Sequence, residues 1–306
     1  MSGNTLSLSG LSIERLRSFC QIVDAGSVVA AAGRNPTKQS QFSRQIRDLE
    51  RVLGVKLFVR EGKRLKLTAD GVKLSALTNA YFNALREISG EGQGAPHPLK
   101  LGAAESVIRW LLVPRFTEVV SAAGGPVEMQ NHRTSEVVSH LENGQLDLGI
   151  IRADARSDAL ELLPFPVLRY VLMVPRAALP EKSAAGILSV RVLPFVSITG
   201  DGQFVRGVER IVEANRLPLK ILSKVESFSL AIEVAKVIGA ATLVPSHAEG
   251  EFPTEQFTPV ALDGMDTLNR RLAVAFSKKT TELNARAKRF AVRLSRAFEG
   301  GLREPS

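Results

Sequence analysis

Cysteine, histidine and long apolar runs are all scarce in this chain of 306 residues. The single cysteine, Cys20, cannot form a disulfide within the chain, and its place on an apolar helical stripe predicts a buried structural thiol rather than a redox sensor. The four histidines show no paired metal-ligand spacing, so we expect no metal site. No apolar run reaches the roughly 18 residues of a membrane span, and the polar leader MSGNTLSLSG does not resemble a signal peptide. A cytoplasmic protein is therefore expected.

Motifs that carry common catalytic chemistry are also absent from the sequence. It contains no Gly-x-Ser-x-Gly elbow, no phosphate-binding loop and no glycine-rich dinucleotide fingerprint. Its serines and carboxylates are scattered rather than grouped. We therefore expect a protein that is not an enzyme and that uses no cofactor.

Basic residues outnumber acidic ones, and their excess is concentrated at one end of the chain. Residues 1–90 hold 14 Lys and Arg against 7 Asp and Glu, which accounts for +7 of the net charge of +9. Such an excess favours contact with a polyanion such as nucleic acid. The apolar content of 44% is sufficient for two hydrophobic cores, and the length exceeds one ordinary domain.

The segment from Ser27 to Leu57 predicts two helices joined by a short turn. At about 100° per residue, one face of the second helix is apolar. This face consists of Phe42, Ile46, Leu49 and Leu53. Gly26 and Gly54 are expected to end helices, and Ser27 and Thr37 to cap the helices that follow them.

Elements on either side of this segment complete a winged helix-turn-helix. Upstream, apolar residues between Ile13 and Val23 repeat with a helical period and predict a first helix beneath the other two. Downstream, residues 56–60 and 64–68 are expected to pair as strands around a turn at residues 61–63. We therefore expect residues 1–70 to form an α-rich DNA-binding domain.

The outward face of the second helix and the wing carry hydrogen-bond donors that suit a DNA major groove. The side chains predicted to read bases are Gln39, Ser40, Ser43 and Arg44. Those predicted to contact the phosphate backbone are Arg47, Arg60, Lys63, Arg64 and Lys66. An ordinary solvated helix also has a polar outward face, but the local concentration of positive charge argues against that alternative.

A series of short motifs runs through the same region. The motifs are Leu16-Arg17-Ser18-Phe19, Gly26-Ser27, Ala31-Ala32, Gln39, Ser43-Arg44-Gln45-Ile46, Leu49-Glu50, Leu53-Gly54, Leu57-Phe58, Arg60 and Leu67-Thr68-Ala69-Asp70-Gly71. In order and spacing they resemble the N-terminal pattern of the LysR-type transcriptional regulators. The chain departs from that pattern at Asn35, Pro36 and Thr37, and at Ser40, where the family often has proline. These departures bear on base preference more than on DNA binding.

A long helix is predicted over residues 69–88, and its apolar stripe needs a partner. The stripe consists of Leu74, Leu77, Tyr81, Leu85 and Ile88. Because the helix leads into a linker, we expect residues 71–90 to pair with a second copy; packing on the same chain's winged domain is the alternative. The resemblance also implies homodimers that associate into homotetramers. Residues 91–98 are polar and glycine-rich, which is typical of a hinge.

From Leu99 onward, strand and helix patterns alternate, which predicts mainly parallel sheets covered by helices. The expected strands are 99–103, 127–130, 146–151, 170–174, 195–198, 219–225, 242–244 and 272–276. The expected helices are 107–120, 135–143, 204–214, 229–237 and 282–298. The resemblance implies a two-lobed α/β fold like that of periplasmic binding proteins, within an effector domain over residues 99–306. Lobe 1 would hold residues 99–165 and 266–306, and lobe 2 residues 166–265.

Ligands of open α/β sheets bind beyond the carboxyl ends of strands, where helix N-termini present free N–H groups. The resemblance also places effector contacts in these loops. The candidate effector-binding residues are Ser106, Arg133, Thr134, Thr199, Asp201 and Phe228. Ser106 and Thr134 are equally consistent with helix caps, and Phe228 with a core aromatic. Glu105 would oppose an anionic effector unless a cation such as Arg133 offsets it, so the effector's charge stays open.

Together these features predict a sequence-specific DNA-binding transcriptional regulator, controlled by a small-molecule effector bound between two lobes. Its expected partners are double-stranded DNA, the effector and further copies of the chain, with RNA polymerase as another candidate and no membrane. Two alternatives stay open. One is an architectural DNA-binding oligomer without effector control, and the other is a solute-binding or catalytic α/β protein with a basic N-terminal appendage.

Overall fold

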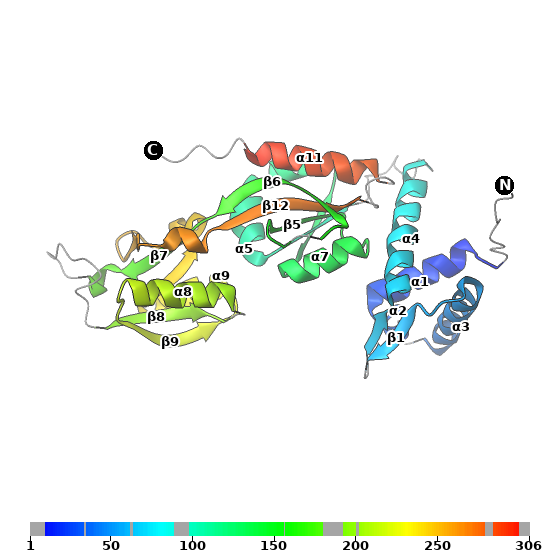
Figure 1. Ribbon diagram of the computed structural model, residues 1–306, viewed down its shortest axis with the longest axis horizontal. Helices are drawn as coiled ribbons and strands as arrows, with labels where there is room; N and C mark the ends of the chain where they lie inside the picture. Colours follow the sequence, from blue (N-terminus) through cyan, green and yellow to red (C-terminus); the bar gives the residue numbers. More distant parts are fainter. Residues whose placement is uncertain are drawn as a thin grey trace.

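The computed structural model describes residues 10–33, 35–61, 64–88, 98–155, 157–179, 192–199, 202–278 and 284–299. A helical domain with a small hairpin, called the winged domain below, is followed by two lobes that are each built on a five-stranded sheet. The winged domain lies at one end of the molecule, lobe 2 lies at the other end, and lobe 1 lies between them (Figure 1). In the described part of the chain, no helix combines the length and apolarity needed to cross a membrane.

The winged domain has the predicted three helices and hairpin. Its elements are α1 (Ile13–Ala25), α2 (Val28–Ala31), α3 (Pro36–Leu53), β1 (Phe58–Glu61) and β2 (Arg64–Leu67). Phe19, Ile22 and Leu49 are fully buried in its core, and Cys20 is buried beside them as predicted. β1 and β2 pair antiparallel. The apolar stripes read from the sequence therefore face one shared core.

The ends of these helices follow the predicted signals except at the start of α3. Gly26 and Gly54 end α1 and α3 in the left-handed conformation, and Ser27 caps α2. The prediction that Thr37 caps α3 was wrong. The cap is Asn35, whose Oδ1 accepts from the backbone N–H groups of Thr37 (3.0 Å) and Lys38 (3.2 Å). Pro36 explains the shift, because its fixed φ and missing N–H suit the first helical position and leave the cap to the preceding residue.

Lobe 1 consists of a sheet in the order β4-β3-β5-β12-β6 with helices on both faces. Its elements are β3 (Leu99–Ala103), α5 (Glu105–Val107), α6 (Phe116–Ala123), β4 (Val127–Asn131), α7 (Thr134–Glu142), β5 (Leu148–Arg152), β6 (Leu160–Leu168), β12 (Arg270–Ser277) and α11 (Ala285–Glu299). One core packs α6 and α11 against the sheet, and a second core packs α7 against the opposite face. The expected helix 107–120 is instead broken by a π-helical turn at Ile108–Leu112 and a 3₁₀ turn around Pro114.

Lobe 2 has a sheet in the order β11-β7-β10-β8-β9. Its elements are β7 (Tyr170–Pro175), β8 (Leu193–Ile198), α8 (Gln203–Ala214), β9 (Leu219–Val225), α9 (Phe228–Ile238), β10 (Ala241–Pro245), the 3₁₀ segment Ser246–Glu251 and β11 (Phe257–Val260). One core lies under α9 and the other under α8. Two layers of helix thus enclose the sheet, as the alternating pattern predicted.

The prediction of mainly parallel sheets was wrong, because both sheets are mixed. In lobe 1, β3 pairs parallel with β4 and β5, while β12 pairs antiparallel with β5 and β6. In lobe 2, β8 pairs parallel with β9 and β10, while β7 pairs antiparallel with β10 and β11. The chain leaves lobe 1 through β6 and returns through β12, so these neighbours run in opposite directions (Figure 1).

Two strands, β6 and β11, were not predicted, and both contain proline. Pro164 and Pro166 lie in β6, and Pro259 lies in β11. Proline cannot donate to a sheet ladder, so it lowers the strand signal of a sequence. Both strands lie at the edge of their sheet, where one side of the backbone has no strand to pair with and proline is tolerated.

Candidate functional site

The outward face of α3 is accessible, and its opposite face is buried. Ile46 and Leu49 are buried against the other helices. Among the predicted DNA-binding residues of this helix, Ser40, Arg44 and Arg47 are exposed, and Gln39 and Ser43 are half-buried. The helix therefore presents the predicted hydroxyl and guanidinium groups to solvent while its apolar stripe holds it on the domain.

Contacts with α1 hold α3 in this orientation. Arg15 forms an ion pair with Asp48 (3.4 Å), and the side-chain amide of Gln45 donates to Glu14 (3.1 Å). The hydroxyl of Ser18 donates to Gln45 as well. All of these contacts lie on one side of α3, so the residues of the outward face do not take part in them.

The arginines on the outward face differ in the ion-pair and hydrogen-bond partners that they already have. Arg51 pairs with Asp48 at 2.7 Å, and Arg47 Nε donates to the carbonyl oxygen of Ser43 at 3.2 Å. No acidic side chain among the described residues lies within ion-pair distance of Arg44. Arg44 is therefore available to bind an external acceptor without first breaking an ion pair.

The predicted wing residues lie on the hairpin that follows α3. Lys66 is exposed on β2, where it pairs across the hairpin with Val59 of β1. Arg60 lies on β1 and Arg64 on β2. Lys63, which connects the two strands, lies outside the described residues. The hairpin thus carries basic residues on the same domain as the outward face of α3.

The two opposite faces of helix α4 (Ala69–Ile88) have different surroundings. On one face, Leu77, Tyr81 and Leu85 are exposed, and Leu77 is 55% exposed. On the other face, Asn79 Nδ2 donates to the carbonyl oxygen of Gly144 in lobe 1 at 3.1 Å. Gly144 has a φ of +67°, and a Cβ there would lie 3.1 Å from the Cα of Ala76. Lobe 1 therefore packs on the back of α4 and leaves Leu77, Tyr81 and Leu85 open, whereas Leu74 of the predicted stripe packs on the core of the winged domain.

Polar side chains from both lobes meet in a group that we call the interlobe clamp, formed by Glu105, Arg109, Trp110, Ser229 and Glu251. Glu251 accepts from Arg109 Nε (3.1 Å), Arg109 Nη2 (3.0 Å) and Trp110 Nε1 (2.5 Å). Ser229 accepts from Arg109 Nη1 (3.2 Å) and donates to Glu105. Sequence reasoning singled out Glu105 alone, because nothing local marks partners 142 residues apart such as Arg109 and Glu251.

Three aromatic rings, those of Phe228, Tyr170 and Phe204, form a group next to Trp110 of the clamp. Phe228 lies 6.5 Å from Trp110, 5.7 Å from Tyr170 and 5.6 Å from Phe204, measured between ring centroids. Burial raises the pKa of Tyr170 to about 12. Phe228 packs both against lobe 2's core and against Trp110 of lobe 1, so the two predicted roles for this residue, core aromatic and cleft residue, are compatible.

The other predicted effector-binding residues are spread over both lobes. Ser106 is buried within α5, and Thr134 begins α7. Neither residue is a helix cap, because the cap positions are Ala104 and Arg133. The backbone N–H of Arg133 donates to the Glu136 carboxylate at 2.8 Å, and this N–H is therefore not open to a ligand. Asp201 lies outside the described residues.

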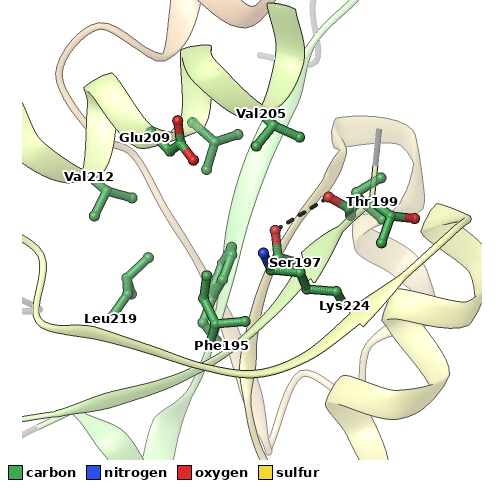
Figure 2. A pocket seen from close by; sticks show the side chains of 11 residues that line it. Phe195, Ser197, Thr199, Val205, Glu209, Val212, Leu219 and Lys224 are labelled. Atoms are coloured by element: carbon green, nitrogen blue, oxygen red, sulfur yellow. Dashed lines mark hydrogen bonds between the residues drawn. The ribbon is translucent and has the colours of Figure 1, made fainter. Parts of the chain in front are cut away.

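Thr199 lines a cavity of about 340 Å³ in lobe 2 that opens to solvent (Figure 2). The cavity lies between α8 and strands β8 and β9. Its apolar walls are formed by Phe195, Ile198, Val205, Val208, Val212, Leu219 and Ile221, and its polar lining by Ser197, Thr199, Glu209 and Lys224. Within the described residues, no three His, Cys, Asp or Glu side chains come together as a metal site would require.

Comparisons with known proteins agree with this architecture. Residues 13–72 match the family described as bacterial regulatory helix-turn-helix protein, lysR family, and residues 92–299 match the LysR substrate binding domain. The transcriptional regulator PcaQ of Agrobacterium fabrum is 28% identical over 150 residues, which cover 47% of this chain and 48% of PcaQ. The chain thus matches about half the length of that relative. The regulator HdfR of Yersinia enterocolitica is 25% identical over 249 residues, covering 78% of this chain and 83% of HdfR.

A solved structure shows the same fold. Full-length LysG of Corynebacterium glutamicum, with bound effector Arg, aligns with a TM-score of 0.60 at 16% identity, covering 94% of this chain and 99% of LysG. The substrate-binding family alone matches more than half of the chain. The chain therefore belongs to the LysR family of DNA-binding transcriptional regulators.

Proposed function

We propose that this regulator reads operator DNA with α3 and the wing, as a dimer formed through α4, under the control of a small molecule that binds between its lobes. The observation that carries the proposal is the outward face of α3, where Arg44 is exposed and has no described acidic partner. A helix of 18 residues whose opposite face is buried can enter the major groove without disturbing its domain. We place the protein in the cytoplasm, because that is where the operator DNA lies.

The two predicted groups of residues differ in what they contribute. Base edges are read by short or bidentate donors, a role we give to Gln39, Ser40, Ser43 and Arg44. Phosphates need only positive charge at the right place, a role we give to Arg47, Arg60, Lys63, Arg64 and Lys66. The first group sets base preference, and the second supplies affinity that depends on salt concentration.

The exposed stripe of α4 supports dimerisation. Leu77, Tyr81 and Leu85 lie on one face, and pairing with a second copy would remove this apolar surface from water. A twofold pair would present two α3 helices to successive major grooves. Further association of such dimers would give the tetramer implied by the family resemblance.

Control by an effector is supported by the arrangement of the lobes. LysG, which was solved with bound effector Arg, has the same two-lobed fold. In this chain the interlobe clamp joins the lobes through side chains that must separate if the lobes open. The bond from Asn79 to Gly144 ties lobe 1 to α4, so a change in the angle between the lobes would reach the winged domains.

Selection of bound fragments from genomic DNA, followed by binding assays over a range of salt concentrations, tests the DNA-binding part. Arg44→Ala should weaken the preference for the selected sites by about 1–3 kcal/mol. Lys66→Ala should weaken binding to all sequences alike and lower the salt dependence by about one phosphate contact. Arg296→Ala on α11, an exposed cation in lobe 1, is the control. Unchanged binding by both the Arg44 and Lys66 variants would show that the interface is assigned to the wrong surface.

A further inference from the structure

The cavity of lobe 2 is separate from the interlobe clamp. All residues that line it belong to the stretch from Phe195 to Lys224, and none belongs to lobe 1. Its volume of about 340 Å³ falls within the range of roughly 300–1,000 Å³ that is typical of small-molecule pockets. The space can therefore hold a small molecule without any opening of the lobes.

Two opposite charges border this cavity from different elements. Glu209 comes from α8 and Lys224 from β9, and Figure 2 shows them on different sides of the space. Neither has an ion-pair partner among the side chains that the structure describes. Both side chains are exposed to water, and a pair of opposite charges at one cavity is complementary to a ligand that carries both charges itself.

The hydroxyl groups lie with the cation rather than with the carboxylate. Figure 2 shows Lys224 reaching toward Ser197, with Thr199 beside them. The Thr199 hydroxyl donates to the carbonyl oxygen of Val225 at 2.9 Å. The Ser197 hydroxyl makes only a long contact of 3.4 Å with the carbonyl oxygen of Ile198. Ser197 and Lys224 can therefore both donate to an incoming carboxylate.

The rest of the lining is apolar. Val205 and Val212 lie along α8, and Phe195 and Leu219 lie across from them (Figure 2). Val208, which is also on α8, lines the same space. An apolar group of the ligand placed between these walls would leave water and gain contacts on both sides.

We propose that this cavity binds an apolar α-amino acid, with its carboxylate at Lys224 and Ser197, its ammonium at Glu209, and its side chain between α8 and the strands. The site lies in lobe 2 alone, so it is distinct from the effector site between the lobes and does not depend on DNA binding. Occupancy would brace α8 against β9.

Calorimetric titration of the full chain with L-leucine, L-valine and L-phenylalanine tests the proposal. At least one of them should bind saturably. For the best of them, the analogue without the ammonium and the analogue without the carboxylate should each bind at least tenfold more weakly; for leucine these are 4-methylpentanoate and 3-methylbutylamine. An absence of saturable binding by all three amino acids overturns the proposal.

Variants locate the binding site. Val208→Trp should fill the cavity and abolish binding, while Lys224→Met and Glu209→Gln, both at exposed positions, should weaken it at least tenfold in a chain that stays folded. Lys220→Met, on the same strand but outside the cavity, should bind like the unmodified chain. Binding that survives in both charge variants, or that is lost equally in the Lys220 control, refutes the assignment. Because the readout is heat of binding, the result is independent of the DNA assays above.

Discussion

Replacement of Glu251 by leucine should open the interlobe clamp. The Trp110 side chain is almost buried, at 5% exposure, so loss of the acceptor for its indole N–H costs about 1–3 kcal/mol. The ion pair with Arg109 adds no more than about 1 kcal/mol, because that guanidinium is half-exposed and screened by water. We therefore expect Glu251→Leu to destabilise the joined arrangement of the lobes by about 1–4 kcal/mol. Glu251→Gln should cost less, since its amide oxygen can still accept from Trp110.

The chain carries its own reporter for this experiment. Trp110 is the only tryptophan in the sequence and belongs to the clamp, so intrinsic fluorescence reads the state of this site directly. In Glu251→Leu, the emission should shift to longer wavelength as water reaches the indole, and unfolding followed by fluorescence should move to lower denaturant concentration.

A neighbouring glutamate provides the control. Glu249 lies in the same 3₁₀ segment and is exposed, so Glu249→Leu changes charge and size in the same way without touching the indole. If the Glu251 and Glu249 variants emit at the same wavelength and unfold at the same denaturant concentration, the clamp does not hold the lobes together.

Three further predictions concern stability. Asn35→Ala should destabilise the winged domain by about 1 kcal/mol through loss of the cap of α3, whereas Thr37→Ala should have a smaller effect in thermal unfolding by circular dichroism. Burial raises the pKa of Asp147, so its carboxyl group holds a proton more tightly in the folded chain than in the unfolded chain. The free energy of unfolding should therefore fall as pH rises from about 3.8 through the pKa of the folded state. Asp147→Asn should flatten that dependence in denaturant titrations, and an unchanged slope would contradict it. Gly144→Ala should speed hydrogen exchange in α4 more than Gly124→Ala, because both glycines have positive φ but only Gly144 is crowded by α4.

The winged domain was predictable to within a few residues because its signals are local. A helical period, a glycine after the last turn and a polar residue before the first one act over a few neighbouring residues. The error at Thr37 is local as well: proline prefers the first helical position, and weighing this would have placed the cap at Asn35. The outward face of α3 follows from the same period, which is why the predicted base-reading residues of α3 lie on accessible positions.

The lobes were predictable as alternating elements but not in their pairing. The missed strands β6 and β11 depend on their edge positions, which are properties of a finished sheet. The mixed strand directions arise because the chain passes between the lobes twice, and no local pattern records the direction of a neighbour.

By itself, the amino-acid sequence determined the family, the helix that carries the candidate DNA-reading groups, and the alternation of strand and helix, because each depends on residues that are close along the chain. The tertiary structure alone decided that Glu251 meets Arg109 and Trp110, that α4 packs on the turn at Gly144, and that Thr199 lines a cavity within lobe 2. These contacts join residues that are distant in sequence. Their geometry is set only when whole sheets and helices pack together, which residue spacing does not encode.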